Sequence, residues 1–385
     1  MLNHIIKDFI QTRQSRAIGV GFFAIGFLFG NWATFIPYVK DKFQLNDADL
    51  GLVLLSMPVG TILMNMGGAW LVNKIGMKNT AILGIIGMAL AFCIPLNAPS
   101  IWLLSIGLFL SGSGISVTNI AINMGVSSIE HSLKVNIMST CHGMFSVGLM
   151  ISSILASTVR GMGIVPGYYM LAMAALIIIL ALIVKPTIFK IQEEKHSSGS
   201  TKFVWPRGMF LLMILIALCG NITEGAMADW SSVYMRDIVQ TSPYFVGWGL
   251  AGYSLFMALG RLFGDMIIPK YGAQNVLFYG GLIVMVGLGL VLLLPYTWTS
   301  IIGFAIVGAG VSCGAPILYS SASRVPDLSK GTGLAVLNTF AMGGFMAGPV
   351  LIGFISEEYS LKVAFVIVLI LALTWSVLTK KVKLF

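Results

Sequence analysis

Charged residues are scarce in this chain of 385 residues. Asp, Glu, Lys and Arg together make up 10% of it, whereas a soluble domain has about 25%. Hydrophobic residues make up 57%, and the mean hydropathy is +0.93. This balance excludes an ordinary soluble globular protein, and it leaves little chain for a soluble catalytic domain.

Motifs for nucleotide or metal chemistry are also missing. The sequence contains no GxxxxGKS run that would cradle phosphates and no HExxH pair that would bind zinc. The four cysteines lie in apolar runs without CxxC spacing, so neither a metal site nor a disulfide framework is indicated. We therefore expect no catalytic residues, no metal, no cofactor and no enzyme activity.

Long apolar runs dominate what is present, and they predict an all-α integral membrane protein. A stretch such as LAMAALIIILALIV is continuously apolar, whereas a β-barrel strand would alternate apolar and polar residues. About 20 apolar residues are enough for a helix to cross a bilayer. Twelve such spans are expected, over residues 17–39, 49–72, 79–97, 100–127, 135–159, 165–185, 208–235, 244–268, 275–295, 298–322, 332–356 and 360–379.

The basic residues are distributed unevenly between the loops. If the loops are numbered alternately, 18 lysines and arginines fall on one side and 5 on the other. This is the positive-inside pattern, so we expect an inner-membrane protein with both termini in the cytoplasm, and the net charge of +9 gives no reason to expect nucleic acid. We expect two halves, residues 1–185 and 208–385, joined by a polar cytoplasmic linker over 186–207.

The second half repeats the first. A shift of 196 residues aligns glycines without a gap, for example Gly51 with Gly247, Gly76 with Gly272, Gly112 with Gly308 and Gly148 with Gly344. A shift of 198 residues aligns Asn31-Trp32 with Asp229-Trp230. Because each half has an even number of spans, the halves are expected to be parallel six-helix repeats, as in one large class of secondary transporters.

Two loops carry a resemblance to a known family. AWLVNKIGMKN (Ala69 to Asn79) and GRLFGDMIIPKYGAQN (Gly260 to Asn275) are similar to the signature loops of the major facilitator superfamily. EGAMADWS in the seventh span and CHGMFSVG in the fifth resemble bacterial permeases of the fucose permease type. The signature and gating candidates are Asn73, Lys74, Gly76, Arg261, Gly264, Asp265, Lys270 and Gly272.

The first loop departs from the family pattern. Ala69 replaces the usual glycine, Asn73 the usual aspartate and Met77 the usual basic residue. We expect Arg261 and Asp265, one turn apart, to pair as a latch between the halves, because an acid near the end of a span needs a partner. The lysines of these loops are equally compatible with simple topology anchors.

The resemblance implies that the first, fourth, seventh and tenth spans line a cavity while the third, sixth, ninth and twelfth face outward. The outward spans contain no charged residue, and the cavity spans are more polar. Polar residues also hold membrane helices together, and tryptophan also anchors interfaces. The substrate-binding candidates are Asn31, Trp32, Asn119, Asn123, Glu224, Trp230, Tyr319 and Asn338.

Three residues are candidates for proton coupling: Glu224, Asp229 and His142. An uncompensated acid at the centre of a span costs roughly 2.5–3.5 kcal/mol, and burial disfavours its charged form, so Glu224 could bind and release a proton. Alternatively, it is a protonated acid bonded to a neighbouring helix. Five residues separate the two acids, which places them about 140° apart, and Asp229 could instead pair with Arg236. His142 could relay protons or simply pack.

The function expected from these patterns is secondary transport of a small polar solute by alternating access, coupled to protons as in a symporter. The partners would be the solute, a proton and membrane lipid, and the protein would act as a monomer. A proton-driven exporter of drug-like compounds is the first alternative. A membrane sensor or assembly protein of the same shape is the second.

Overall fold

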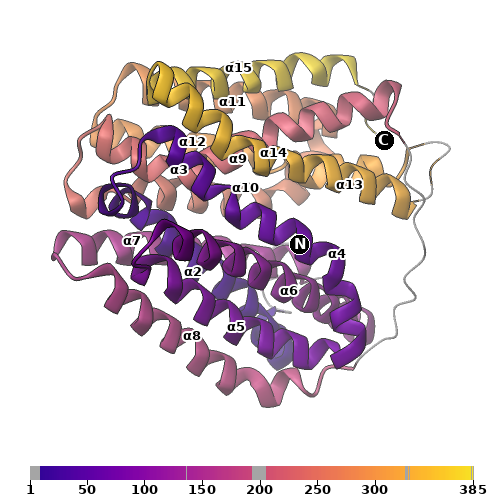
Figure 1. The fold of residues 1–385 in the computed structure, drawn as a ribbon. Helices are drawn as coiled ribbons and strands as arrows, with labels where there is room; N and C mark the ends of the chain where they lie inside the picture. Colours follow the sequence, from indigo (N-terminus) through magenta and orange to yellow (C-terminus); the bar gives the residue numbers. More distant parts are fainter. Residues whose placement is uncertain are drawn as a thin grey trace. The chain divides into compact units, whose positions relative to one another are not determined.

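The structure is a computed structural model that describes residues 9–135, 137–192, 205–325, 328, 330–382 and 384. Within these ranges it contains helices and no strand (Figure 1). Most of the expected linker lies outside the described residues, as do the side chains of Ala69 and Asp265. The chain divides into two compact units.

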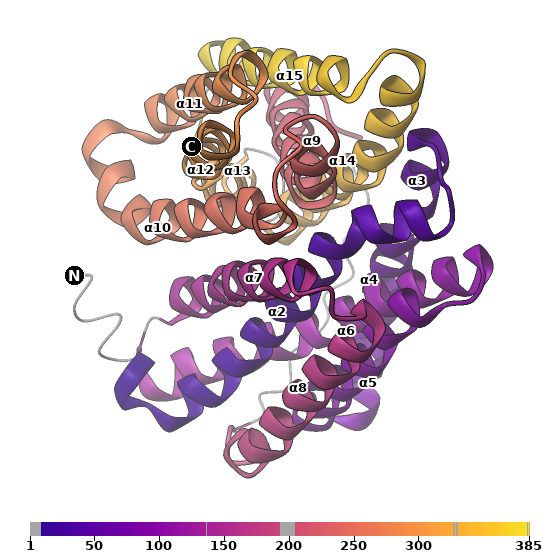
Figure 2. The same ribbon diagram turned by 90° about the vertical axis from the view of Figure 1, so that its left-hand side faces the viewer.

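The first unit comprises Met1–Gln44, Val53–His196 and Ser242–Ala251. In it α2 packs against α7, and α5 packs against both α6 and α8 (Figure 2). Its elements are α2 (Arg13–Lys42), α4 (Ser56–Ile75), α5 (Met77–Asn97), α6 (Ile101–Leu133), α7 (Met138–Gly161), α8 (Pro166–Ile188) and the short 3-10 helix η1 (Pro243–Phe245).

The second unit comprises Leu45–Leu52, Ser197–Thr241 and Gly252–Phe385. In it α9 packs against α14 and α15, and α11 packs against α12 and α15. Its elements are most of α3 (Asp47–Leu54), α9 (Gly208–Asp237), most of α10 (Trp248–Tyr271), α11 (Ala273–Leu293), α12 (Thr297–Val311), α13 (Gly314–Ala322), α14 (Lys330–Glu358) and α15 (Leu361–Lys381).

The expected spans are confirmed in the part of the chain that the structure describes. Eleven helices there, counting α3 with α4 and α12 with α13, are long and apolar enough to cross a membrane. The remaining expected span, the eighth, is occupied by the 24-residue helix α10. The observed helices start and end within a few residues of the expected bounds, except that the fourth span continues to Leu133.

Two of the spans are interrupted, which the apolar runs did not indicate. The second span breaks at Leu55 between α3 and α4, just before Pro58, whose ring nitrogen has no hydrogen to donate. The tenth span breaks at Ser312 and Cys313 between α12 and α13. Interrupted helices within a membrane are tolerated where they are buried in protein or line a cavity.

Helix contacts follow the internal repeat. A Cβ on Gly112 would overlap the carbonyl oxygen of Met57, and a Cβ on Gly308 would overlap that of Tyr253, 196 residues further on in both partners. The loop glycines Gly76 and Gly272 have φ of 84° and 81°, a region that side chains disfavour. The same glycines therefore have the same structural task in each unit, which agrees with two parallel repeats.

Each unit contains a short segment from the other half of the sequence. In the second unit, Gly51 of α3 lies against α14, so that a Cβ there would be 2.6 Å from the Pro349 carbonyl oxygen. In the first unit, Gly247 lies against α7, where its Cβ would be 2.6 Å from the Ser153 carbonyl oxygen. Both pairs are related by the 196-residue shift.

Polar contacts hold these two exchanged segments. The backbone N–H of Asp47 donates to Glu357 Oε2 at 3.0 Å, and Ser356 donates to the Asp47 carboxylate. In the first unit, the backbone N–H of Gly247 donates to Ser157 Oγ at 2.6 Å. The exchange is therefore bonded at both ends, by carboxylates in one unit and by a hydroxyl in the other.

Candidate functional site

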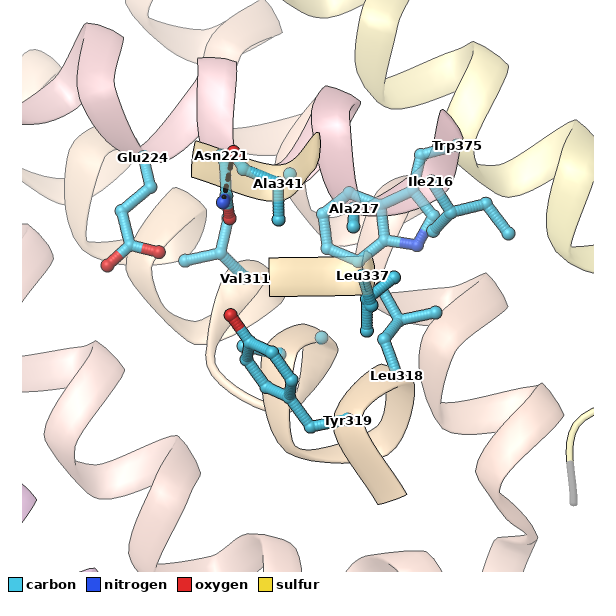
Figure 3. A pocket seen from close by; sticks show the side chains of 13 residues that line it. Ile216, Ala217, Asn221, Glu224, Val311, Leu318, Tyr319, Leu337, Ala341 and Trp375 are labelled. Atoms are coloured by element: carbon cyan, nitrogen blue, oxygen red, sulfur yellow. Dashed lines mark hydrogen bonds between the residues drawn. The ribbon is translucent and has the colours of Figure 1, made fainter. Parts of the chain in front are cut away.

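A polar recess lies within the second unit, between α9, α13, α14 and α15 (Figure 3). Its cavity volume is about 20 Å³, which is room for about one water molecule. Asn221 of α9 lies in one wall, where its Nδ2 donates to the backbone oxygen of Ala341 at 2.7 Å. This bond fixes the orientation of the amide.

Glu224 stands at the open side of the recess, one turn beyond Asn221 on α9. Its Oε1 lies 3.7 Å from Nη2 of Arg261 on α10, and the two side chains are 25% and 20% exposed. This separation is longer than a hydrogen bond, so the pair is a loose ion pair. A charged acid in a membrane span requires such compensation.

The contact gives Arg261 a partner that the sequence did not indicate. We expected Arg261 to pair with Asp265, whose side chain lies outside the described residues, so that pairing stays a prediction. In the structure the guanidinium of Arg261 lies next to Glu224. Arg261 had been counted among the loop charges, and so its contact with an acid of the seventh span was not predicted.

Tyr319 lines the recess and is bonded to Asn338. Tyr319 of α13 donates its hydroxyl to Asn338 Oδ1 of α14 at 2.9 Å. Both were expected as substrate-binding residues, and the structure brings them together with Glu224, which lies within electrostatic range of Tyr319. The three therefore form one polar cluster on three helices.

Tyr253 of α10 is a residue that the sequence did not single out. It is 1% exposed, and its hydroxyl has no hydrogen-bond partner within the described residues. It lies within electrostatic range of both Glu224 and Arg261. An unpaired buried hydroxyl is costly, so its position beside the ion pair suggests that water, solute or a rearranged carboxylate can reach it.

Trp375 lines the recess from α15, the twelfth span, which we expected only to face outward. It is 1% exposed, and its indole lies near positions where Cβ atoms of Gly220, Gly280 and Gly314 would be, at 3.9, 3.7 and 3.3 Å. Three helices thus supply glycines that make room for the ring. The outward orientation of the twelfth span stays a prediction, and Trp375 shows that one large aromatic of this helix packs inward.

Asp229 lies further along α9 and is not paired with Arg236. Arg236 instead binds Asp237, with Nη2 donating to Oδ2 at 3.0 Å. Asp229 has neither a hydrogen bond nor an ion pair among the residues described. Glu224 and Asp229 do not form a carboxylate pair, as their spacing on the helix indicated.

Asn31 occupies a closed environment in the first unit. It is fully buried, its Nδ2 donates to the Phe27 oxygen at 2.9 Å, and its Oδ1 accepts from the Tyr169 hydroxyl at 2.7 Å. Both ends of the amide are therefore bonded to protein. Its expected role in substrate binding stays a prediction, which would require release of the Tyr169 bond.

The other expected residues of the first unit are placed as follows. Asn123 donates to Asn119 Oδ1 at 2.7 Å, so these two amides share one helical face. His142 contacts the Phe22 ring edge to face, with centroids 4.9 Å apart. Trp32 is 1% exposed. Their substrate and proton roles stay predictions.

Trp230 of the second unit is completely buried, and its indole N–H has no partner among the described residues.

The signature loops are organised by their glycines and lysines. Lys74 lies over the Trp70 ring at 4.8 Å, and Lys270 lies over the Tyr271 ring at 5.1 Å. A Cβ on Gly264 would be 3.0 Å from the Cys313 sulfur, so this glycine permits close helix approach.

One motif match does not indicate catalysis. GVSCG, Gly310 to Gly314, has the GxSxG spacing of a hydrolase nucleophile, but that motif requires a turn between a strand and a helix. Here it forms the break between α12 and α13, and Ser312 Oγ donates to the Ala309 oxygen at 2.7 Å. Ser312 is therefore a bonded helix-end residue.

Comparison with known proteins decides the family. The family model of the Major Facilitator Superfamily matches residues 18–238 and 209–382, which together span nearly the whole chain. The chain belongs to the Major Facilitator Superfamily. An uncharacterized MFS-type transporter of Yersinia pestis is 32% identical over 380 residues, covering 97% of this chain and 97% of the relative.

Solved structures agree with this assignment at the level of the fold. The nucleoside transporter NupG aligns with a TM-score of 0.77 at 12% identity, covering 96% of this chain and 99% of that one. FucP, a transporter of the same superfamily, aligns with a TM-score of 0.64 at 16% identity, covering 95% and 97%. The resemblance inferred from the signature loops is confirmed, and the protein is a multi-pass membrane transporter, a class distinct from enzymes.

Proposed function

We propose that this transporter moves a small polar solute across the bacterial inner membrane by alternating access, and that proton binding at Glu224 drives the movement. The observation that supports this most is the loose ion pair of Glu224 and Arg261 at the open side of a recess. A carboxylate held by one contact longer than a hydrogen bond can part from its partner at modest cost.

The lining of the recess favours a hydroxyl-rich or amide-bearing solute. Asn221 and Tyr319 contribute an amide and a hydroxyl group to the lining, Asn338 accepts from that hydroxyl, and Trp375 adds a flat aromatic face. Such a mixture of an apolar wall and a few polar groups is typical of specific small-molecule sites. A multiply charged anion is disfavoured, since Arg261, the cation that contacts this cluster, is already neutralised by Glu224.

The nature of one structural neighbour suggests where to begin. NupG is a nucleoside transporter. Nucleosides carry hydroxyl groups and a flat ring, which match the polar groups and the aromatic face of this lining. A thermal-shift screen of purified protein against nucleosides, sugars and amino acids should identify the ligand, because a ligand stabilises the state that it binds.

The decisive experiment is uptake of that ligand into proteoliposomes with an imposed pH gradient. Glu224→Gln should abolish the acceleration by the gradient while counterflow without a gradient persists, since the amide cannot carry a proton. Glu358→Gln is the matched control, because Glu358 is an exposed acid at the end of α14. Gradient-driven uptake by Glu224→Gln at the wild-type rate would refute the coupling role, and Asp229→Asn and His142→Gln would then be tested in the same way.

The same vesicles separate the remaining alternatives. Reversing the gradient distinguishes import from proton-driven export of the same compound. Absence of flux and of thermal stabilisation by all the compounds screened would favour the sensor or assembly function instead.

A further inference from the structure

A second and larger cavity opens on the side of the second unit, along α10, α11 and the α12–α13 break. Its cavity volume is about 810 Å³, against about 20 Å³ for the polar recess. Its walls carry four aromatic residues, each of them more than a third exposed: Phe256, Phe263, Tyr271 and Tyr279. We call this cavity the lateral groove.

The groove is specific to the second half of the sequence. With the 196-residue shift, the four aromatic positions correspond to Gly60, Gly67, Ile75 and Leu83 in the first half. The fold alone therefore does not require aromatic side chains at these places. An apolar groove of this size on a membrane-spanning chain suits an acyl chain, which buries apolar area against the walls.

One end of the groove is basic. Lys270 precedes the lining residue Tyr271 and lies over its ring at 5.1 Å, and Lys380 of α15 lies 4.6 Å from the ring of Phe278, next to the lining residue Tyr279. Gln274 Nε2 donates to the Thr379 oxygen at 3.1 Å and so ties the end of α15 to the start of α11. Lys270 and Lys380 thus lie close to two residues of the mainly apolar lining, Tyr271 and Tyr279.

This combination complements one class of molecule. Basic residues next to apolar clefts at the cytoplasmic end of membrane helices attract anionic headgroups, and the loop between α10 and α11 is on the basic side of the chain. We propose that the lateral groove binds an anionic phospholipid, with an acyl chain between the aromatic walls and the phosphate between Lys270 and Lys380. This site is separate from the polar recess and does not depend on the transported solute.

The floor of the groove adjoins the recess. Ser312 and Cys313 line the groove, whereas Val311 and Gly314, on either side of them, line the recess. The Cys313 thiol donates to the Gly260 oxygen at 3.6 Å, and Arg261 follows directly. A bound lipid therefore lies across the broken tenth span from the Glu224 ion pair, which places it where it can stabilise that break.

Native mass spectrometry of the full chain tests the proposal, with phosphatidylglycerol and phosphatidylcholine of identical acyl chains as probes. The wild type should retain phosphatidylglycerol in preference to phosphatidylcholine. Lys270→Gln combined with Lys380→Gln should lower that preference by roughly fivefold for each lysine. Lys185→Gln is the matched control, because Lys185 lies over the Phe189 ring at the end of α8 in the first unit, and it should leave the preference unchanged.

A second variant tests the apolar part of the site. Ala309→Phe places a ring in the groove and should reduce retention of both lipids while the protein stays monodisperse. Equal retention of the two lipids by the wild type would overturn the proposal, as would a double lysine variant that matches Lys185→Gln. A shift of the wild type to dimers without lipid would overturn it in favour of an interface between copies.

Discussion

The bond between Tyr169 and Asn31 offers a direct measurement of what one buried polar contact contributes to this fold. Tyr169→Phe removes only the hydroxyl, because the ring keeps its edge contact with Phe35, whose centroid is 5.8 Å away. Asn31 then keeps its bond to the Phe27 oxygen, but its Oδ1 loses its donor inside a site with no exposed surface.

The magnitude follows from two contributions. A side-chain hydrogen bond within a membrane protein contributes about 0.6 kcal/mol on average and up to about 1.7. A buried acceptor left without a partner costs about 1–3 kcal/mol in general. We therefore expect Tyr169→Phe to lower the free energy of unfolding by about 1–2 kcal/mol, which is a 5- to 30-fold change in the unfolding equilibrium.

The assay is reversible unfolding in mixed micelles with increasing dodecyl sulfate. Tyr168→Phe is the matched control, since Tyr168 is the adjacent residue and is 72% exposed; it should unfold like the wild type. A double-mutant cycle with Asn31→Ala should show a coupling of similar size, because the two residues touch. If Tyr169→Phe unfolds like Tyr168→Phe, the buried hydrogen bond does not stabilise the fold as argued. In that case, a transport defect of Asn31→Ala without loss of stability would support substrate binding by Asn31.

Two further substitutions test packing and capping. Gly308→Ala should destabilise the second unit by about 1–3 kcal/mol, because its Cβ would overlap the Tyr253 carbonyl. The control Gly289→Ala has open space around it and should be neutral or stabilising by up to about 1 kcal/mol. Unfolding in mixed micelles measures both variants, and equal stabilities would contradict the packing at Gly308. Glu130→Gln should speed hydrogen exchange at the start of α7, because the carboxylate accepts from two backbone N–H groups there at 2.7 and 2.9 Å; unchanged protection would count against this cap.

The long apolar runs were sufficient to predict the helices, because a bilayer requires each span to be a helix of about the same length. The same rule cannot locate a break. Leu55 and the Ser312–Cys313 pair lie within apolar runs, and their interruption depends on which backbone groups find partners in the folded unit. Pro58 was a visible signal for the first break.

The recess was predicted in part. Glu224, Tyr319 and Asn338 were identified from polarity in spans that the resemblance directs inward, and they do lie together. The contact of Arg261 with Glu224 and the place of Trp375 in the recess lining were not predicted, since Arg261 was expected to pair with Asp265 and Trp375 belongs to a span without charges. The packing of the whole unit decides which neighbouring helix a long side chain contacts. The pattern of polar and apolar residues along the sequence does not predict this packing.

The exchanged segments affect the order in which the two units can fold during synthesis. The first unit includes Ser242–Ala251, so it lacks one of its pieces until well over half of the protein has left the ribosome. The second unit includes Leu45–Leu52, a piece that has by then been waiting since early in synthesis. Neither half of the gene therefore encodes a self-sufficient product, and co-expressed halves cut in the linker should accumulate only together.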